Sequence, residues 1–284
     1  MVIVNSETKI NVICSHNYVL PNKTPILFLH GFTGSAEDWS FITNKLNDTF
    51  FPIAIDLPGH GKTETNNTIT SYSTNSHIKI VESVFSHFNI SKAIIVGYSM
   101  GGRTALSFAV KNPKKVVALI LESSTAGIEN KVERDSRIKI DSEIADNILI
   151  DGIDTFVQYW LDLPFFKSLK SLSKKEHSHL VEQKRKNSTT GLANSLKGFS
   201  TGKMPSLWCK LNKLSFPTLL IAGRFDRKYV RINEAINQAI KNSELSIVEN
   251  CGHNTHLENP KEFTILVNSF FNNLDYHETQ LAKS

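Results

Sequence analysis

A serine hydroxyl is the best-placed reactive group of this chain. Ser99 is the central residue of Gly-Tyr-Ser-Met-Gly at 97–101, which follows an apolar run at 93–96 and precedes a helix-like run that begins at residue 102. Glycines on both sides of the serine permit a sharp turn in which larger side chains would clash with the strand or the helix. The sequence therefore predicts that a strand, a turn and a helix hold the hydroxyl at the carboxyl edge of a sheet, where it can act as a nucleophile or as a base.

An acid and a histidine follow the serine in an order that suits a catalytic triad. Asp226 comes just after the apolar run 218–222, and His253 comes just after the run 245–248. Because the carboxyl ends of parallel strands meet at one edge of a sheet, we expect both side chains beside Ser99. Each residue also has a plainer interpretation, since Asp226 could cap a helix, His253 could lie in a turn and Ser99 could be a surface hydroxyl.

A fourth element precedes the serine. The apolar run 26–29 leads into His-Gly-Phe at 30–32, and we interpret this loop as the source of an oxyanion-hole amide at Phe32. Four elements in this order, all at strand ends, favour the triad over the separate plainer interpretations.

Apolar runs and helical periodicity alternate along the chain. Strands are expected at 10–15, 26–29, 51–55, 93–96, 117–121, 218–222 and 245–248. Helices are expected at 39–46, 73–88, 103–111, 230–241 and 261–273. This alternation predicts a mostly parallel sheet with helices on both faces, an arrangement that resembles the α/β-hydrolase fold.

The pattern changes between the fifth and sixth of these strands. Charged residues and helical periodicity replace apolar runs, with helices expected at 132–150, 155–163, 173–186 and 190–199. We interpret residues 124–210 as a helical lid inserted into a core made of 1–123 and 211–284. A lid over the serine would exclude water and select the substrate.

Composition limits the class of protein. The chain has 284 residues, 40% of them apolar, and a net charge of +5. No apolar stretch reaches the ~18–20 residues of a membrane span, and the first residues do not resemble a signal peptide. The basic block 184–186 is interpreted as a solvated helix face, so no nucleic-acid partner and no membrane insertion are expected. Cysteines at 14, 209 and 251 lack metal-ligand spacing, which favours a reduced, cytoplasmic protein in which Cys251 is a small apolar filler rather than a second nucleophile.

Several motifs carry a more specific resemblance. They lie at 29–39, 97–103, 121–127, 199–208 and 252–260, and so extend through the core and the insertion. Together they resemble the 2-succinyl-6-hydroxy-2,4-cyclohexadiene-1-carboxylate synthase family, pyruvate-eliminating enzymes of menaquinone biosynthesis with an α/β-hydrolase fold.

Arg103 is the most informative residue of these motifs. It lies four residues after Ser99, so one helical turn places both on nearly the same face, and its guanidinium can hold a carboxylate through two hydrogen bonds. Without the resemblance, a surface arginine would be the simpler interpretation. Other substrate-binding positions implied by the resemblance are Tyr98, Arg137, Trp160 and either Lys184 or Arg185.

The reaction implied by the resemblance is an elimination. Pyruvate would leave 2-succinyl-5-enolpyruvyl-6-hydroxy-3-cyclohexene-1-carboxylate, a small polyanionic substrate, with Ser99 as a base activated by His253 and Asp226. Amides of Phe32 and Met100 would stabilise the charge that develops on the ketone oxygen. No cofactor and no metal are expected. The alternatives are a carboxyl-ester or carbon–carbon bond hydrolase with the same triad and, more remotely, a non-catalytic ligand receptor.

Overall fold

A single twisted sheet carries the rest of the molecule. The computed structural model describes residues 1–5 and 8–281, and the side chains among them as far as residue 274. In this described part, nine strands form one sheet in the order β1-β2-β4-β3-β6-β7-β8-β9, with β5 paired to β2. The strands are β1 (Val2–Val4), β2 (Thr8–Ile13), β3 (Thr24–Leu29), β4 (Phe50–Ile55), β5 (Glu64–Thr65), β6 (Ala93–Tyr98), β7 (Val116–Glu122), β8 (Thr218–Gly223) and β9 (Ser243–Val248).

The direction of the strands follows the prediction. Neighbours from β4 through β3, β6, β7 and β8 to β9 are parallel, whereas β2 runs antiparallel to β1, β4 and β5. All the strands expected from apolar runs are present. The two additional ones, β1 and β5, have three and two residues, too short to give a run of their own.

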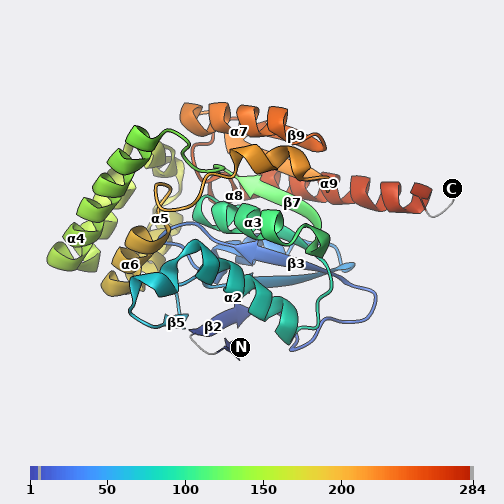
Figure 1. The fold of residues 1–284 in the computed structure, drawn as a ribbon, viewed down its shortest axis with the longest axis horizontal. Coiled ribbons are helices and arrows are strands. Elements are labelled where there is room, and N and C mark those ends of the chain that lie inside the picture. Colours follow the sequence, from blue (N-terminus) through green and yellow to red (C-terminus); the bar gives the residue numbers. More distant parts are fainter. Residues whose placement is uncertain (6–7, 282–284) are drawn as a thin grey trace.

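Helices cover both faces of the sheet (Figure 1). On β3, Leu27 and Leu29 belong to the apolar cluster that includes α2, α3 and α7, whereas Ile26 and Phe28 belong to the cluster with α1 and α9. This alternation buries both faces, so the predicted fold class is confirmed. The core helices are α1 (Ser40–Thr43), α2 (Thr74–His87), α3 (Met100–Lys111), α7 (Arg227–Ala239), α8 (Thr255–Glu258) and α9 (Pro260–Leu281).

One core helix is shorter than expected. Instead of a helix over 39–46, a 3-10 turn at Ala36–Trp39 passes into α1, which ends at Thr43. The chain then turns at Asn47, whose carbonyl accepts from the N–H of Phe50, and enters β4. The helical pattern of apolar residues in the sequence therefore continues past the last residue of the helix.

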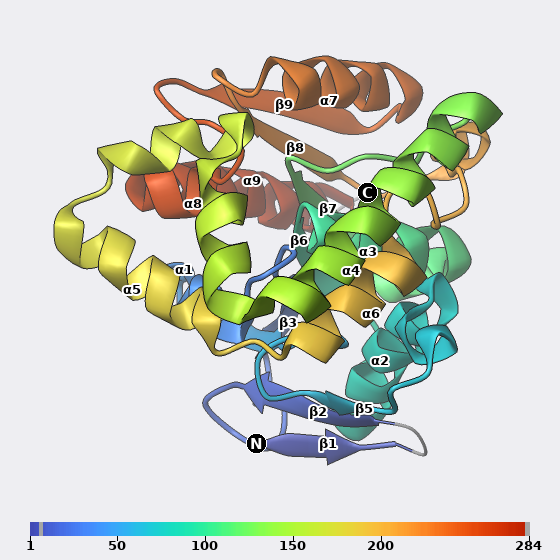
Figure 2. The ribbon, with the colours of Figure 1, turned by 90° about the vertical axis from the view of Figure 1, so that its left-hand side faces the viewer.

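The helical insertion lies between β7 and β8 and faces the viewer in Figure 2. It contains α4 (Lys131–Asp162), the 3-10 segment η4 (Pro164–Ser171), α5 (Lys174–Arg185) and α6 (Thr189–Phe199). It has an apolar cluster of its own, with members such as Ile148, Trp160 and Leu192, whereas Phe199 already packs with the core. The two helices expected at 132–150 and 155–163 form α4, which is kinked at Gly152 (φ 80°, ψ 174°). The limits 124–210 for the lid stay a prediction.

None of the helices described, those of the insertion included, is long and apolar enough to cross a membrane.

Candidate active site

The turn between β6 and α3 presents Ser99 in a backbone conformation that is rare outside glycine, with φ 50° and ψ −103°. Its N–H donates to the Glu122 carbonyl on β7 at 2.8 Å, and its own carbonyl accepts from the N–H of Arg103 at 3.0 Å. A side chain at Gly97 would collide with the backbone of α3, and one at Gly101 with the end of β3. Close backbone packing therefore holds the serine in this strained turn.

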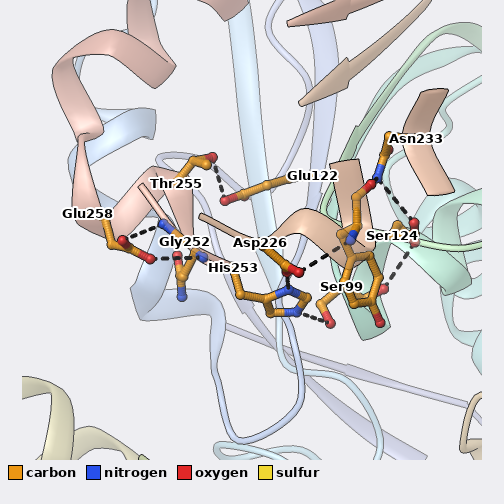
Figure 3. Close-up of polar contacts among 11 residues, drawn as sticks. Ser99, Glu122, Ser124, Asp226, Asn233, Gly252, His253, Thr255 and Glu258 are labelled. Carbon is orange, nitrogen blue, oxygen red and sulfur yellow. Dashed lines mark hydrogen bonds and ion pairs between the residues drawn. The ribbon is translucent and has the colours of Figure 1, made fainter. Parts of the chain in front are cut away.

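The structure brings the predicted serine, histidine and acid together (Figure 3). His253 Nε2 lies 3.1 Å from Ser99 Oγ, and His253 Nδ1 lies 2.5 Å from Asp226 Oδ2. The carboxylate accepts the Nδ1 proton, so Nε2 is the nitrogen that can take a proton from the serine. The histidine and the aspartate are both buried, with 4% and 6% of their surface exposed.

Local hydrogen bonds fix the histidine and the acid. The Asp226 carboxylate begins α7 and accepts from the N–H of Tyr229 at 3.2 Å. On the loop that carries His253, Glu258 accepts from the N–H of Gly252 at 2.7 Å and of Asn254 at 3.2 Å (Figure 3). Residues on both sides of the histidine are thus tied to one carboxylate, whose pKa is raised by burial.

A second histidine–carboxylate pair lies behind the first. Glu122, at the end of β7, accepts from the Thr255 hydroxyl at 2.7 Å and lies 2.6 Å from His256 Nδ1. Both members of the pair are fully buried, and the His256 ring stacks on Trp39 with ring centroids 4.2 Å apart. Sequence reasoning assigned no role to this pair, although a glutamate that ends a wholly apolar strand was a signal of a buried partner.

The loop after β3 carries Phe32, the residue expected to supply an oxyanion-hole amide. In the described part of the chain, no backbone carbonyl accepts from the amides of Phe32 or Met100, so both are available to an oxyanion. The loop turns at Thr33 (φ 67°), whose carbonyl accepts from Asn187 at 2.9 Å and whose hydroxyl accepts from Lys184 Nζ at 2.9 Å. The lid therefore braces the loop that would hold the oxyanion.

Above the serine lies a cavity of about 340 Å³ between the sheet edge and the insertion. Ser99, Met100 and His253 line it, together with positively charged and aromatic side chains. The cations are Arg103, Arg137 and Lys228, and the aromatic residues are Phe32, Tyr98, Tyr159, Trp160, Phe165, Phe166, Phe199 and Tyr229. The one carboxylate in its wall, Asp226, is already bound to His253, so the cavity suits an anion with apolar surface.

Arg103 is a buried cation that has no carboxylate partner among the described residues. One of its terminal nitrogens donates to the Phe199 carbonyl at 2.6 Å, and the guanidinium carbon lies 4.6 Å from the centre of the Phe199 ring. Burial lowers its pKa to about 10. The side chain is still charged at neutral pH, and an incoming carboxylate would compensate for its lost hydration.

Arg137 reaches the cavity from α4. Its Nε donates to Asp141, one turn along the helix, at 2.7 Å, and this bond does not use its two terminal nitrogens. Burial opposes its charge, but the hydrogen bond and the charge of Asp141 raise its pKa overall. The aspartate thus keeps a second guanidinium charged beside the first.

The remaining predicted binding residues divide into two groups. Tyr98 and Trp160 line the cavity, and the Trp160 ring meets Phe32 edge-on with centroids 5.1 Å apart. Lys184 and Arg185 are absent from its wall. Lys184 is buried against the Thr33 hydroxyl, with its pKa lowered by burial, and Arg185 pairs with Asp154 at the surface at 2.8 Å. Among the described residues, none from α5 lines this cavity, so the position of the helix keeps both side chains away from it.

No group of three or more His, Cys, Asp or Glu side chains within residues 1–5 and 8–281 is arranged to hold a metal ion.

The sequence and the fold of this chain match those of known proteins. A family model described as alpha/beta hydrolase fold matches residues 24–260. A Bacillus subtilis (strain 168) protein, provisionally named 2-succinyl-6-hydroxy-2,4-cyclohexadiene-1-carboxylate synthase, is 39% identical over 88% of this chain and 90% of its own length. A protein of Enterobacter sp. (strain 638) with the same synthase name is 28% identical over 83% and 86%. The solved structure of MenH from S. aureus matches with a TM-score of 0.88 and 29% identity, over 95% of this chain and all of that one.

Proposed function

Because the chain belongs to the α/β-hydrolase family and, within it, to the family of 2-succinyl-6-hydroxy-2,4-cyclohexadiene-1-carboxylate synthases, we propose that it eliminates pyruvate from 2-succinyl-5-enolpyruvyl-6-hydroxy-3-cyclohexene-1-carboxylate. The observation that carries this proposal is the position of Arg103 and Arg137 in the wall of one cavity with Ser99 and His253. An enzyme that cleaves simple esters needs only the serine and the histidine, whereas an enzyme that binds a substrate with several carboxylates also needs the cations.

Ser99 acts as the base in the proposed mechanism. His253 Nε2, at 3.1 Å, takes the hydroxyl proton, and the serine oxygen removes the ring proton beside the succinyl ketone. The electron pair of that C–H bond moves toward the ketone, and the amides of Phe32 and Met100 stabilise the negative oxygen. As the charge returns, the ring double bond shifts and the C–O bond to the enolpyruvyl group breaks. The leaving group departs as the enolate of pyruvate, which takes up one proton at its terminal carbon and becomes pyruvate.

The cations orient the substrate in this proposal. Arg103 lies one turn after Ser99 on α3, and Arg137 approaches from the lid, so carboxylates bound to both would fix the ring over the serine. Two charge-assisted hydrogen bonds to a carboxylate are the strongest neutral-pH contacts that such side chains make. We further propose that the protein works in the cytoplasm, where a reduced state of its cysteines is expected.

Pyruvate release tests the proposal. Purified protein supplied with the enolpyruvyl substrate should release one pyruvate per product, measured by coupled oxidation of NADH, while aryl esters should react poorly. Arg103→Ala should lower kcat/KM for elimination about 10- to 100-fold, because a hydrogen-bonded charge contact is lost, and should affect ester cleavage far less. Efficient ester cleavage without pyruvate would overturn the proposal in favour of a hydrolase.

A further inference from the structure

The first turn of α7 forms a wall of the cavity that no sequence motif had indicated. Lys228 and Tyr229 follow Asp226 directly, and both line the cavity. The N–H of Tyr229 donates to Asp226, and the Tyr229 ring meets the His253 ring edge-on with centroids 4.6 Å apart. The catalytic acid and histidine therefore fix the position of this tyrosine.

The hydroxyl of Tyr229 is a free donor in the described part of the chain. The hydrogen bonds of this residue there are made by its backbone, with Asp226 as acceptor and Asn233 as donor. Burial raises the pKa of the phenol, although the nearby charges of Arg103 and Arg137 oppose the shift. The phenol therefore keeps its proton at neutral pH, close to both guanidinium groups.

Lys228 brings a third positive charge to the same cavity. Its Nζ lies 5.9 Å from the centre of the Tyr229 ring, and among the described residues it has no ion pair. Its side chain is exposed at the rim, so it can meet a ligand at the entrance. With Arg103 and Arg137 it makes three cations, and the proposed substrate carries three carboxylates, on the succinyl, ring and enolpyruvyl groups.

We propose that Lys228 and Tyr229 form a third carboxylate-binding subsite of this enzyme, with the lysine supplying charge and the tyrosine hydroxyl a hydrogen bond. The subsite takes the place that the sequence had assigned to Lys184 or Arg185, which lie outside the cavity wall. This inference rests on the proposed function for the identity of the substrate. Its geometry, a neutral donor and a cation on one helical turn beside the triad, is independent of the reaction.

Two conservative variants test the subsite. Tyr229→Phe keeps the ring against His253 and removes only the hydroxyl, so KM should rise about 10-fold, the value of a hydrogen bond to a charged group, while kcat changes little. Lys228→Gln should raise KM about threefold, as expected for an exposed charge, and should weaken the salt dependence of kcat/KM.

The chain offers a matched control for each variant. Arg227 lies on the same turn, is exposed and is absent from the cavity wall, so Arg227→Gln removes a charge without touching the subsite. Tyr72 is buried outside the cavity, so Tyr72→Phe removes a hydroxyl elsewhere. Both controls should keep the wild-type KM.

Binding to a blocked enzyme separates this inference from the proposed function. In a Ser99→Ala background, calorimetry gives the Kd of the substrate without turnover, and Tyr229→Phe should raise it about 10-fold. Pyruvate and succinate as competing ligands identify the carboxylate, because only the one that occupies the subsite should bind more weakly to the variant. Unchanged Kd and KM in both variants would overturn the subsite. Failure of the wild-type protein to release pyruvate would instead overturn the proposed function.

Discussion

His253 and His256 lie three residues apart in the sequence and each contacts a carboxylate, yet their surroundings differ completely. The Nε2 of His253 faces the Ser99 hydroxyl at the cavity, while the Nε2 of His256 is buried without a hydrogen-bond partner among the described residues. Both use Nδ1 for the carboxylate, so the pairing itself does not distinguish them. The comparison teaches that access of the second nitrogen to the cavity decides which pair can transfer protons and which can only stabilise the fold.

The two pairs also connect different segments of the chain. Asp226 follows β8 and His253 follows β9, so this pair joins the segments after two adjacent strands. Glu122 accepts from Thr255 and from the N–H of His256, and so joins β7 to the start of α8. The buried pair thus holds in place the helix that directly follows the segment of His253.

Replacing His253 should have the largest effect on catalysis. In His253→Ala no group remains to take the Ser99 proton, so kcat for pyruvate release should fall on the order of 10⁴-fold. The melting temperature, measured by calorimetry, should change by only a few degrees, because Asp226 keeps its bond to the Tyr229 N–H. A variant that keeps a tenth of the wild-type kcat would contradict the assigned role.

Replacing Glu122 should have the opposite profile. Glu122→Ala leaves a fully buried histidine and a hydroxyl without their acceptor, so the free energy of unfolding in urea should fall by about 3–5 kcal/mol. The Ser99 N–H bonds to the main-chain carbonyl of residue 122, which the substitution retains, so kcat of the folded fraction should stay within about tenfold of wild type. Loss of kcat as severe as in His253→Ala, without loss of stability, would erase the distinction between the pairs.

The sequence predicted that three residues of the candidate site meet, because their positions at strand ends determine it. Apolar runs located the strands, so Ser99, Asp226 and His253 could be brought together without knowledge of loop geometry. The same logic failed for α5, because in the described structure this helix contributes no residue to the cavity wall. Lys184 turns toward Thr33, and the sequence offers no signal of that contact.

The cavity wall from α7 was missed for a related reason. Lys228 and Tyr229 follow Asp226 immediately, but successive side chains on a helical turn point in different directions. Only the folded structure shows that these two line the cavity. A glutamate at the end of an apolar strand indicates a buried partner, but no sequence pattern identifies His256, 134 residues away, as that partner.

Two further buried histidines have no carboxylate partner among the described residues, and they should make the stability of the protein depend on pH. His60 and His77 are buried, and burial lowers the pKa of each ring well below its usual value. The folded protein holds these rings neutral, whereas the unfolded chain protonates them below about pH 6.5, so acid favours unfolding. Each ring should therefore reduce the free energy of unfolding by up to about 1.4 kcal/mol for every pH unit below that point.

Urea unfolding between pH 7 and 5 measures this slope. His77→Gln should make this slope shallower by the contribution of one histidine. Arg103, the charge that most affects the pKa of His77, remains protonated throughout this range because its own pKa is about 10. An unchanged slope in the variant would mean that His77 is protonated in the folded state.

Cys251 provides the smallest expected effect, at a position two residues before His253. Burial, and then the charges of Glu258 and Glu122, raise the pKa of this thiol to about 12, so only about one in 10⁴ thiols is ionised at pH 8. Iodoacetamide at that pH should modify the exposed Cys209 and leave Cys251 intact, as judged by peptide masses, with pyruvate release retained. Rapid alkylation of Cys251 with parallel loss of activity would instead place a second reactive group near His253. The residues around His253 would then not be the inert, buried groups that this comparison requires.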